Sequence, residues 1–559
     1  MAATQRPHSA PDTRLVRPRL SEDQLATLER YGTVEPTTAG QVLFAAGDPR
    51  YDLIVLLEGT VEVSDVHEGK PRSIATAGPR DFLAELNLLT GQRAYVTGVV
   101  TKAGSILRVP RDRVGEVIDG HGDLGAFLLQ EMFRRHQMFL QLRAGVQIVG
   151  SRYSPDTQRL REFATRNRLA HAWIDLDNDP AAAALLDSAG VHPGDTPMVL
   201  SEGTDVLRNP SNAQFARAVG ITGEPTSGRT YDLMVIGAGP GGLAAAVYGA
   251  SEGLTTAAVD AVGTGGQAST TSRIENYLGF PTGVSGAEFG DRALLQAVRF
   301  GAQMLVPHRA VGLTRSGGHY LVALEDGTQL PGESVMIATG VSYRRLDVPD
   351  MERFEGLGVF YSPLDPASDV DPDEPVVIVG GGNSAGQAAV ALAGAGHQVH
   401  IAVRGPGLAA SMSTYLLDRI TRDERISVHA HTAVSELHGA RQLESVVLRS
   451  RDSAEPATVQ THYLLAMIGA EPHTQWLPPE LARDEKGFIL TGDAIPPAFR
   501  HSHEWSSLSR APYLYETSLP GVFAVGDVRA GSVKRVAAAA GEGSMAVRLV
   551  QQYLGLVPA

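Results

Sequence analysis

The 559-residue sequence contains no cysteine. Without a thiol the chain forms no disulfide, offers no thiolate to a metal ion and passes no electrons through a cysteine pair of its own. We expect no metal site. Basic residues are also in the minority, because 48 Lys and Arg face 62 Asp and Glu, a net charge of −14. This balance argues against a nucleic-acid partner.

Long hydrophobic runs are missing as well. No apolar segment reaches the ~20 residues that span a bilayer, and the N-terminus lacks the hydrophobic core of a signal peptide. We therefore expect a cytoplasmic protein with no membrane span. The length suggests about three or four domains, and 43% hydrophobic residues supply material for their cores.

A glycine-rich turn stands near the middle of the chain. The apolar stretch Leu233–Ile236 predicts a buried strand that runs into Gly237, Gly239 and Gly242, followed by a helix of small residues. In such a G-x-G-x-x-G turn the glycines permit a tight bend, close approach of a pyrophosphate and close helix packing. After a second apolar strand, Asp260 stands where a carboxylate can hold an adenosine ribose. The pattern predicts a dinucleotide site.

A second strand-turn-helix pattern follows at V-V-I-V-G-G-G-N-S-A, Val376–Ala385. Here Gly380, Gly382 and Ala385 form G-x-G-x-x-A, and the alanine is compatible with a phosphorylated nicotinamide cofactor. The chain is therefore expected to hold two dinucleotides.

The N-terminal part is expected to be all-β from about residue 20 to 110, because short alternating segments are separated by Gly, Pro and Asp. The expected strands are Gln41–Phe44, Leu53–Leu57, Thr60–Ser64, Ser73–Thr76 and Ile106–Val109, with helices at Glu22–Tyr31 and about Leu124–Arg143.

This roll resembles the cyclic-nucleotide-binding domain through D-F-L-A-E-L-N-L-L-T-G at Asp81–Gly91. The resemblance implies that Glu85 would hold a ribose hydroxyl. The family's phosphate-binding arginine is replaced by Ala94, with Arg93 one residue early, and bidentate phosphate recognition tolerates little displacement. A cyclic nucleotide and a structural or partner-sensing role both remain open.

Residues 146–225 resemble a glutaredoxin- or thioredoxin-like domain, with alternating strands and helices and with Thr196-Pro197 at the family's cis-proline position. The family's C-x-x-C turn is Ser154-Pro155-Asp156-Thr157 here, so disulfide exchange is impossible. We expect a structural or docking role.

From Tyr231 to its end the sequence resembles the low-molecular-weight thioredoxin reductases. The matches in family order are the first glycine turn, the loop Gly265–Tyr277, the strand end Ile337–Gly340 and G-V-F-A-V-G-D at Gly521–Asp527. The resemblance implies FAD, NADPH and a homodimer formed through the flavin domains. It further implies that FAD contacts Gln267, Thr270, Asn276, Asp527, Arg535 and Val536.

Two positions depart from that family. Where it carries several arginines for the 2′-phosphate of NADPH, this chain keeps Arg404 alone, and no acid stands at the ribose position, so we expect NADPH rather than NADH. Where it carries the redox-active C-A-T-C, this chain has Ser362-Pro363-Leu364-Asp365. Ser362 and Asp365 accept no electrons, so the acceptor is open: ferredoxin, quinone, oxygen, an external disulfide or a dye.

The expected fold is multidomain α/β and α+β. It comprises a β-roll at 1–145, a thioredoxin-like domain at 146–225, a flavin domain in two segments at 228–345 and 470–559, and a nicotinamide domain at 346–469, the last two of the Rossmann type. The expected activity is electron transfer from NADPH through FAD. The alternative is a flavin-bound sensor whose roll detects a ligand.

Overall fold

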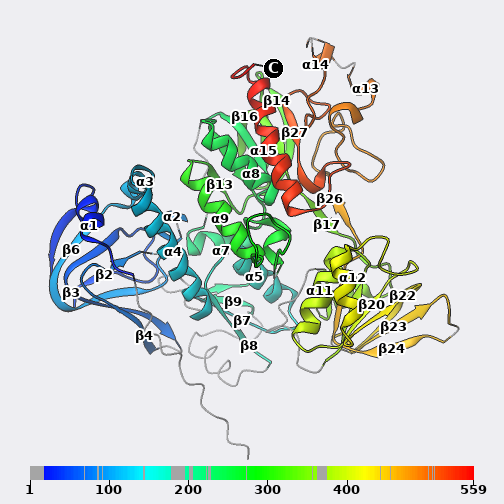
Figure 1. Cartoon of the computed structure of the whole chain (residues 1–559), viewed down its shortest axis with the longest axis horizontal. Helices are drawn as coiled ribbons and strands as arrows, with labels where there is room; N and C mark the ends of the chain where they lie inside the picture. Colours follow the sequence, from blue (N-terminus) through cyan, green and yellow to red (C-terminus); the bar gives the residue numbers. More distant parts are fainter. Residues whose placement is uncertain are drawn as a thin grey trace, which may run out of the picture.

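The computed structural model describes residues 18–67, 70–84, 87–90, 92–142, 145–177, 196–200, 206–221, 223, 228–271, 273–355, 357–361, 374–440, 442–453, 455–500, 503–506, 508 and 510–558. Figure 1 shows four parts. We name them the roll (18–142), the second unit (145–221), the split domain (231–340 with 473–558) and the inserted domain (344–469). Across the described residues, no helix is both long and apolar enough to cross a membrane.

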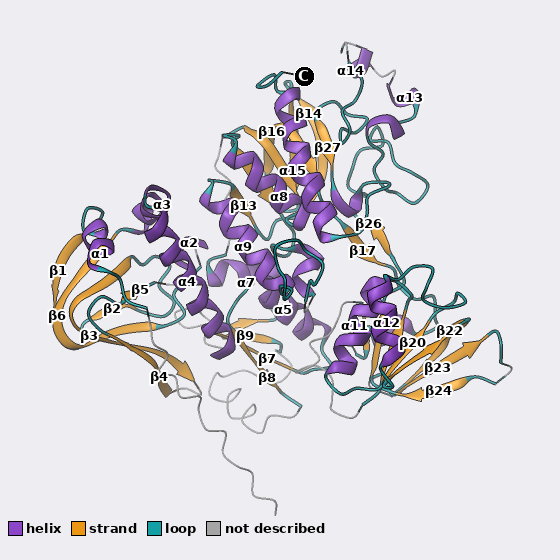
Figure 2. Cartoon of the chain, viewed as in Figure 1, coloured by secondary structure: helices purple, strands orange, loops and turns teal. Residues whose placement is uncertain are grey.

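The roll is β-rich, as expected (Figure 2). Its strands are β1 (Thr33–Thr37), β2 (Val42–Phe44), β3 (Leu53–His67), β4 (Lys70–Ala77), β5 (Phe82–Leu83) and β6 (Thr97–Val109). Its helices are α1 (Glu22–Leu28), α2 (Asn87–Thr90), α3 (Arg111–Gly120) and α4 (Gly122–Leu142). All strand pairs are antiparallel, in the order β1-β6-β3-β4 with β2 on β6 and β5 on β3.

One expectation for the roll is wrong. The two strands predicted at 53–57 and 60–64 are the single strand β3, because Gly59 forms an irregularity within the ladder and not a turn between strands. Gly59 has φ +91°, and a Cβ placed there would lie 2.5 Å from the carbonyl oxygen of Lys102. Glycine is required at this bulge.

The second unit contains β7 (Val146–Gly150), α5 (Pro155–Arg166), β8 (His171–Asp175), β9 (Met198–Leu200), β10 (Leu207–Arg208) and α7 (Asn212–Val219). Strand β7 pairs in parallel with β8 and antiparallel with β9. The Thr196–Pro197 bond is cis, and Ser154 caps α5 by accepting a hydrogen bond from Thr157 N. The helix expected between β8 and β9 lies outside the described residues.

The split domain is built on a mixed sheet. Its strands are β11 (Tyr231–Ile236), β12 (Thr256–Val259), β13 (Gln303–Leu305), β14 (Ala310–Ser316), β15 (His319–Leu324), β16 (Gln329–Ile337) and β27 (Val522–Ala524). Its helical segments are α8 (Pro240–Ser251), η2 (Gly266–Thr270), α9 (Gly286–Arg299), η3 (Gly492–Ala494), α13 (Pro497–Arg500), α14 (His503–Ser506), η4 (Gly526–Val528) and α15 (Val536–Tyr553). Because β11, β12, β13, β16 and β27 are parallel, their carboxyl ends lie at one edge.

The inserted domain has a parallel sheet in the order β18-β25-β19-β20-β21 and an antiparallel sheet β22-β23-β24. Its elements are α10 (Met351–Phe354), β18 (Val359–Phe360), β19 (Val376–Val379), α11 (Asn383–Gly394), β20 (Val399–Ala402), α12 (Thr414–Arg422), β21 (Ile426–His429), β22 (Thr432–His438), β23 (Ser445–Ser450), β24 (Ala457–Gln460) and β25 (Tyr463–Ala466). The chain enters it through β17 (Val341–Tyr343) and leaves through β26 (Ala470–Pro472), and these two strands pair antiparallel.

Helix α9 joins the split domain to both N-terminal parts. Arg168 of the second unit places Nε 2.6 Å from Oδ1 of Asp291 on α9, and both side chains are almost completely buried. Arg299, near the end of the same helix, forms an ion pair at 2.8 Å with Asp119 of the roll. One helix therefore anchors three parts of the chain.

Candidate functional site

The first glycine turn connects β11 to α8. Gly237 has φ +104°, and a Cβ added there would lie 2.3 Å from the carbonyl oxygen of Ala338 on the neighbouring chain segment. A Cβ on Gly242 would lie 1.8 Å from the carbonyl oxygen of Gly237, so the helix sits directly against the turn. Gly239 is different, because its Cβ would meet only the Cα of Gly266, at 3.9 Å. Close packing therefore requires glycine at positions 237 and 242, whereas Gly239 leaves the start of the helix open to a ligand.

The first turn of α8 has no side-chain cap, since its N-cap residue is Gly239. The same holds for α15, whose N-cap Arg535 is exposed and makes no side-chain capping bond to the turn that begins at Val536. The two helix starts are close, because a Cβ on Gly241 would lie 3.1 Å from the carbonyl oxygen of Ala539. Uncapped N–H groups of two helices thus meet at the carboxyl edge of the sheet, an arrangement suited to an anion.

Asp260 follows β12 and organises the turn itself. Its Oδ2 accepts a hydrogen bond from Ala238 N at 2.8 Å, and its Oδ1 accepts from Val262 N and Gly263 N at 2.9 and 3.0 Å. A carboxylate has about four acceptor positions, so room is left for a further donor such as a hydroxyl group.

The loop that carries η2 lies beside this turn. Gly265 N donates to Ala238 O at 2.8 Å. The Gln267 side chain donates from Nε2 to the carbonyl oxygen of Val341, at the start of β17. Thr270 donates from Oγ1 to Gln267 O at 2.9 Å, whereas Asn276 is exposed. The loop therefore touches both the glycine turn and the connection to the inserted domain.

Asp527 lies in η4, directly after β27. Burial raises the pKa of its carboxyl group, although the charge of Lys534 opposes this effect. No described residue donates a hydrogen bond to that carboxylate, while the Asp527 backbone carbonyl accepts one from Lys534 Nζ. A half-buried acceptor of this kind is suited to the hydroxyl groups of a bound ligand.

Sequence reasoning missed Glu542, a buried carboxylate on α15 that holds η4 in place. It accepts a hydrogen bond from Gly526 N at 2.7 Å and pairs with Arg529 at 2.6 Å. Ser532 also donates to it, at 3.0 Å. The signal was a single acid between Gly541 and Gly543 in a helix otherwise rich in alanine.

The second glycine turn connects β19 to α11. Gly380 has φ +143°, and its Cβ would lie 2.2 Å from Met467 O. Gly382 is the N-cap, where an added Cβ would meet nothing within 4 Å, and Ala385 is fully buried. Arg404, just after β20, is exposed and pairs with no described acid. The second turn thus has an open helix start like the first, and the guanidinium of Arg404 lies after the neighbouring strand β20.

The remaining candidates divide into two groups. Glu85, Ser362 and Asp365 lie outside the described residues. In the roll, Ala94 lines a cavity, whereas the neighbouring Arg93 donates from Nη1 to Gly47 O at 2.8 Å.

Comparison with known proteins gives two family matches. Residues 231–543 match the family described as pyridine nucleotide-disulphide oxidoreductase, and residues 35–121 match the cyclic nucleotide-binding domain. The first match spans both glycine turns.

Individual relatives agree with the larger match. The thioredoxin reductase of Treponema pallidum (strain Nichols) is 29% identical over 328 residues, which cover 58% of this chain and 97% of that protein. The NADPH-dependent thioredoxin reductase 3 of Arabidopsis thaliana is 28% identical over 369 residues, covering 63% of this chain and 65% of that protein. The solved thioredoxin reductase of Lactococcus lactis (FR conformation) superposes with a TM-score of 0.52 and 26% identity, over 59% of this chain and 100% of that one.

Proposed function

The chain belongs to the pyridine nucleotide-disulphide oxidoreductase family, and we propose that it is an FAD-dependent NAD(P)H oxidoreductase of the thioredoxin reductase type that works without a cysteine pair. The observation that carries this proposal is the meeting of two uncapped helix starts with the carboxylate of Asp527 at one edge of the split domain. Such a site fits a ligand with both a pyrophosphate and hydroxyl groups.

FAD fits the residues of the split domain. The start of α8, with Gly239 open above it, would receive the pyrophosphate, and Asp260 retains acceptor capacity for the ribose. Asp527 would accept hydrogen bonds from the ribityl chain. Gln267, Thr270 and Asn276 belong to the loop that would lie along the flavin, and the start of α15 favours negative charge there. When bound, FAD supplies the capacity to take a hydride from a reduced nicotinamide and release electrons to an acceptor.

NADPH fits the inserted domain. Gly382 and the start of α11 would receive its pyrophosphate, and the exposed guanidinium of Arg404 is free to pair with a 2′-phosphate. One matched relative is described as NADPH-dependent. These observations support NADPH as the preferred donor over NADH.

The relatives are thioredoxin reductases, but this chain contains no sulfur of the kind that relays electrons, because it has no cysteine. Electrons would have to leave the flavin directly for an acceptor that reaches it. A folded disulfide protein would have to bring its disulfide directly to the flavin, which its bulk opposes, whereas a small oxidant can diffuse there. We propose that thioredoxin is not reduced at a useful rate.

The decisive experiment is anaerobic stopped-flow reduction of the purified yellow protein by NADPH and by NADH. Reoxidation is then followed with thioredoxin, ferredoxin, a quinone, oxygen and an artificial dye. We expect rapid reduction by NADPH, rapid reoxidation by the dye and negligible reoxidation by thioredoxin, with an authentic thioredoxin reductase as positive control. Thioredoxin turnover comparable with that of the dye would overturn the proposal, and so would protein that binds no FAD.

A flavin-bound sensor is the second candidate. The packing of both N-terminal parts on α9 favours it, because that helix adjoins the loop expected to lie along the flavin. Very slow turnover with every acceptor, together with a change of domain orientation on ligand binding to the roll, would support the sensor over the enzyme.

The assembly is proposed to be a homodimer formed through the split domains. Apolar side chains exposed on that domain support this proposal, among them Leu278, with 93% of its surface exposed, and Tyr248, with 46%. Light scattering coupled to size-exclusion chromatography tests it, and a monomer at micromolar concentration would contradict it.

A further inference from the structure

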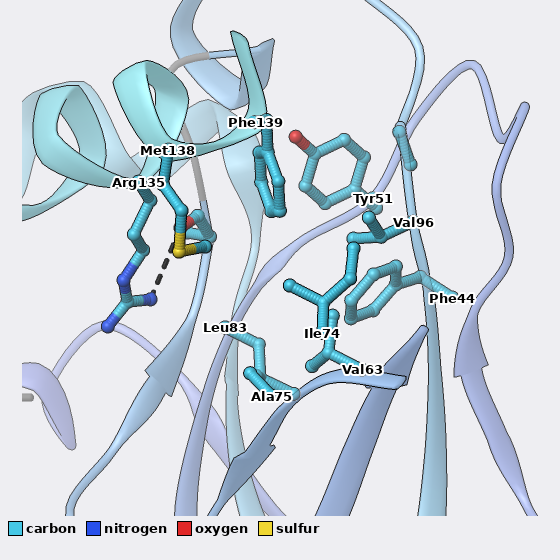
Figure 3. Close-up of a pocket in the computed structure, with 12 residues that line it drawn as sticks. Phe44, Tyr51, Val63, Ile74, Ala75, Leu83, Val96, Arg135, Met138 and Phe139 are labelled. Atoms are coloured by element: carbon cyan, nitrogen blue, oxygen red, sulfur yellow. Dashed lines mark hydrogen bonds between the residues drawn. The ribbon is translucent and has the colours of Figure 1, made fainter. Parts of the chain in front are cut away.

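The roll encloses a narrow apolar cavity between its sheet and helix α4 (Figure 3). Including the part open to solvent, the cavity has a volume of about 500 Å³. Three aromatic side chains border it: Phe44, Tyr51 and Phe139. Phe44 and Tyr51 are stacked, with ring centroids 5.7 Å apart and planes 28° from parallel. The space, which we call the slot, is thus lined by aromatic rings and aliphatic side chains.

The described part of this wall is poorly suited to a cyclic nucleotide. A cyclic phosphate requires a cation or several N–H donors, because burying its charge unpaired is costly. Ala94, at the position of the family's phosphate-binding arginine, lines the cavity with a methyl group, and so does Ala84.

Arg135 is the one basic residue among the described residues of the lining, and its side chain hydrogen-bonds to the backbone of the cavity wall. Its Nη1 donates to the carbonyl oxygens of Phe82 and Ala84, and its Cζ lies 3.9 Å from the centre of the Phe82 ring. The guanidinium therefore ties α4 to the end of β5 across one side of the cavity.

We propose that this cavity is a binding site for a compact, flat and predominantly apolar molecule of about one or two aromatic rings, and not for a cyclic nucleotide. Moving apolar surface from water into such a slot is favourable, and ring stacking on Phe44, Tyr51 or Phe139 adds directional contact. The inference does not depend on the proposed oxidoreductase function, since it concerns the roll alone.

Helix α4 gives the site a path to the rest of the molecule. Met138 and Phe139 of this helix line the cavity. Phe133, about one turn earlier, lies 5.8 Å from the guanidinium carbon of Arg292 on α9. Helix α9 in turn packs against η2. Occupancy of the slot is therefore expected to alter the environment of a flavin held by η2.

The test is isothermal titration calorimetry of the full chain with toluene, p-cresol and indole, and separately with cyclic AMP and cyclic GMP. We expect saturable binding of at least one of the three aromatic compounds, and weaker binding of both cyclic nucleotides. Ala75→Phe, which fills the slot, should weaken that binding at least tenfold. Its matched control is Ala103→Phe, an exposed position on β6 that should leave affinity unchanged.

A second variant guards against misfolding. Met138→Ala widens the slot and should shift preference toward indole, the largest of the three compounds. Flavin fluorescence recorded in the same titrations reports the path through α4. The proposal is wrong if none of the three compounds binds, if a cyclic nucleotide binds more tightly than all of them, or if neither variant changes affinity. A chain that binds indole but carries no FAD would sustain this inference while contradicting the proposed oxidoreductase.

Discussion

Arg168 of the second unit and Asp291 of helix α9 form a buried ion pair, with Nε and Oδ1 2.6 Å apart, between residues 123 positions apart in the sequence. Burial raises the pKa of Asp291 although the nearby guanidinium opposes the shift. The pair is therefore costly to desolvate, and it is more costly still to break.

Removing one partner of this pair should destabilise the chain strongly. Arg168→Leu leaves Asp291 buried without its partner, a change worth about 3–5 kcal/mol of the free energy of unfolding. Replacing both residues by leucine should restore most of that loss, because no unpaired charge remains. The exposed pair Arg299–Asp119 is the control, and Arg299→Leu should cost less than about 1 kcal/mol. Chemical denaturation measures all of these variants, and equal effects of both arginine substitutions would contradict the expectation.

Asp527→Ala should weaken FAD retention. If the carboxylate accepts hydrogen bonds from the ribityl chain, its loss costs about 1.5–3 kcal/mol of binding free energy, which is roughly a 10- to 150-fold weaker dissociation constant. Flavin absorbance after exhaustive dialysis measures the effect. Asp418→Ala, on an exposed position of the inserted domain, is the control. Full occupancy of the Asp527 variant would show that the ligand lies elsewhere.

Arg404→Ala should raise the KM for NADPH and leave that for NADH unchanged. The expected cost is about 1.5–3 kcal/mol, because a charged hydrogen bond to the 2′-phosphate is lost. Steady-state kinetics with a dye as acceptor checks this, and Arg451→Ala, another exposed arginine of the inserted domain, serves as comparison. If Arg404→Ala affects both cofactors equally, this residue does not read the phosphate.

An exposed ion pair joins the inserted domain to the split domain. Arg419 on α12 lies 2.9 Å from Glu275, with half and one third of the two side chains exposed. Such pairs are worth about 0.2–1 kcal/mol. If the inserted domain moves against the split domain, Arg419→Ala should therefore shift the balance between its orientations by less than about fivefold.

The absence of native cysteine makes this shift measurable by fluorescence transfer. Labels can be attached at E252C and T421C alone, since both positions are exposed. The difference between Arg419→Ala and the parent should vanish at 1 M salt, where screening removes the pair. Arg422→Ala is the matched control, and a distribution of distances that Arg419→Ala leaves unaltered at low salt would contradict the prediction.

The inserted domain should lose stability in mild acid. His400 Nδ1 and His429 Nε2 are 3.1 Å apart, and burial lowers the pKa of both rings. The unfolded chain therefore binds protons at higher pH than the folded chain does. The contribution of this histidine pair to the free energy of unfolding is complete above about pH 7. It declines as the pH falls through ~6.5, the pKa in the unfolded chain, toward the lowered pKa values of the folded chain.

Thermal unfolding between pH 5.5 and 8 tests the histidine pair. His429→Gln should flatten the dependence on pH, whereas His438→Gln, at an exposed position, should leave it as in the parent. An unchanged slope in His429→Gln would assign the acid sensitivity to other groups.

The parts of the fold that could be predicted from sequence are those fixed by local sterics. Gly237 and Gly380 stand where positive φ and a close carbonyl oxygen exclude any side chain. Because both turns require glycine, their positions could be predicted from the spacing of glycines in the sequence. Gly59 follows the same rule, but its role as a bulge was misread as a turn, because a glycine alone does not say which of the two it serves.

Long-range partners were not predictable. Neither Arg168 nor Asp291 belongs to a motif or a periodic pattern, and their pairing depends on how two units dock. Glu542 was overlooked for a similar reason: its partners Gly526 and Arg529 come from a loop that the helix merely packs against. The contact of Gln267 with Val341 likewise depends on where a connecting strand passes.

The pairing of β17 with β26 brings both chain crossings between the split and inserted domains into one two-stranded ribbon, with Val341 opposite Pro472 and Tyr343 opposite Ala470. A rotation of the inserted domain against the split domain would pivot at this ribbon, because both connections pass through it. Gln267 ties the loop that carries η2 to the ribbon at Val341, so that loop would be displaced least. Strand β24, at the edge of the sheet β22-β23-β24, lies away from the ribbon (Figure 1) and would be displaced more. Contacts at the ribbon can therefore stay intact while the second glycine turn changes its distance from the first.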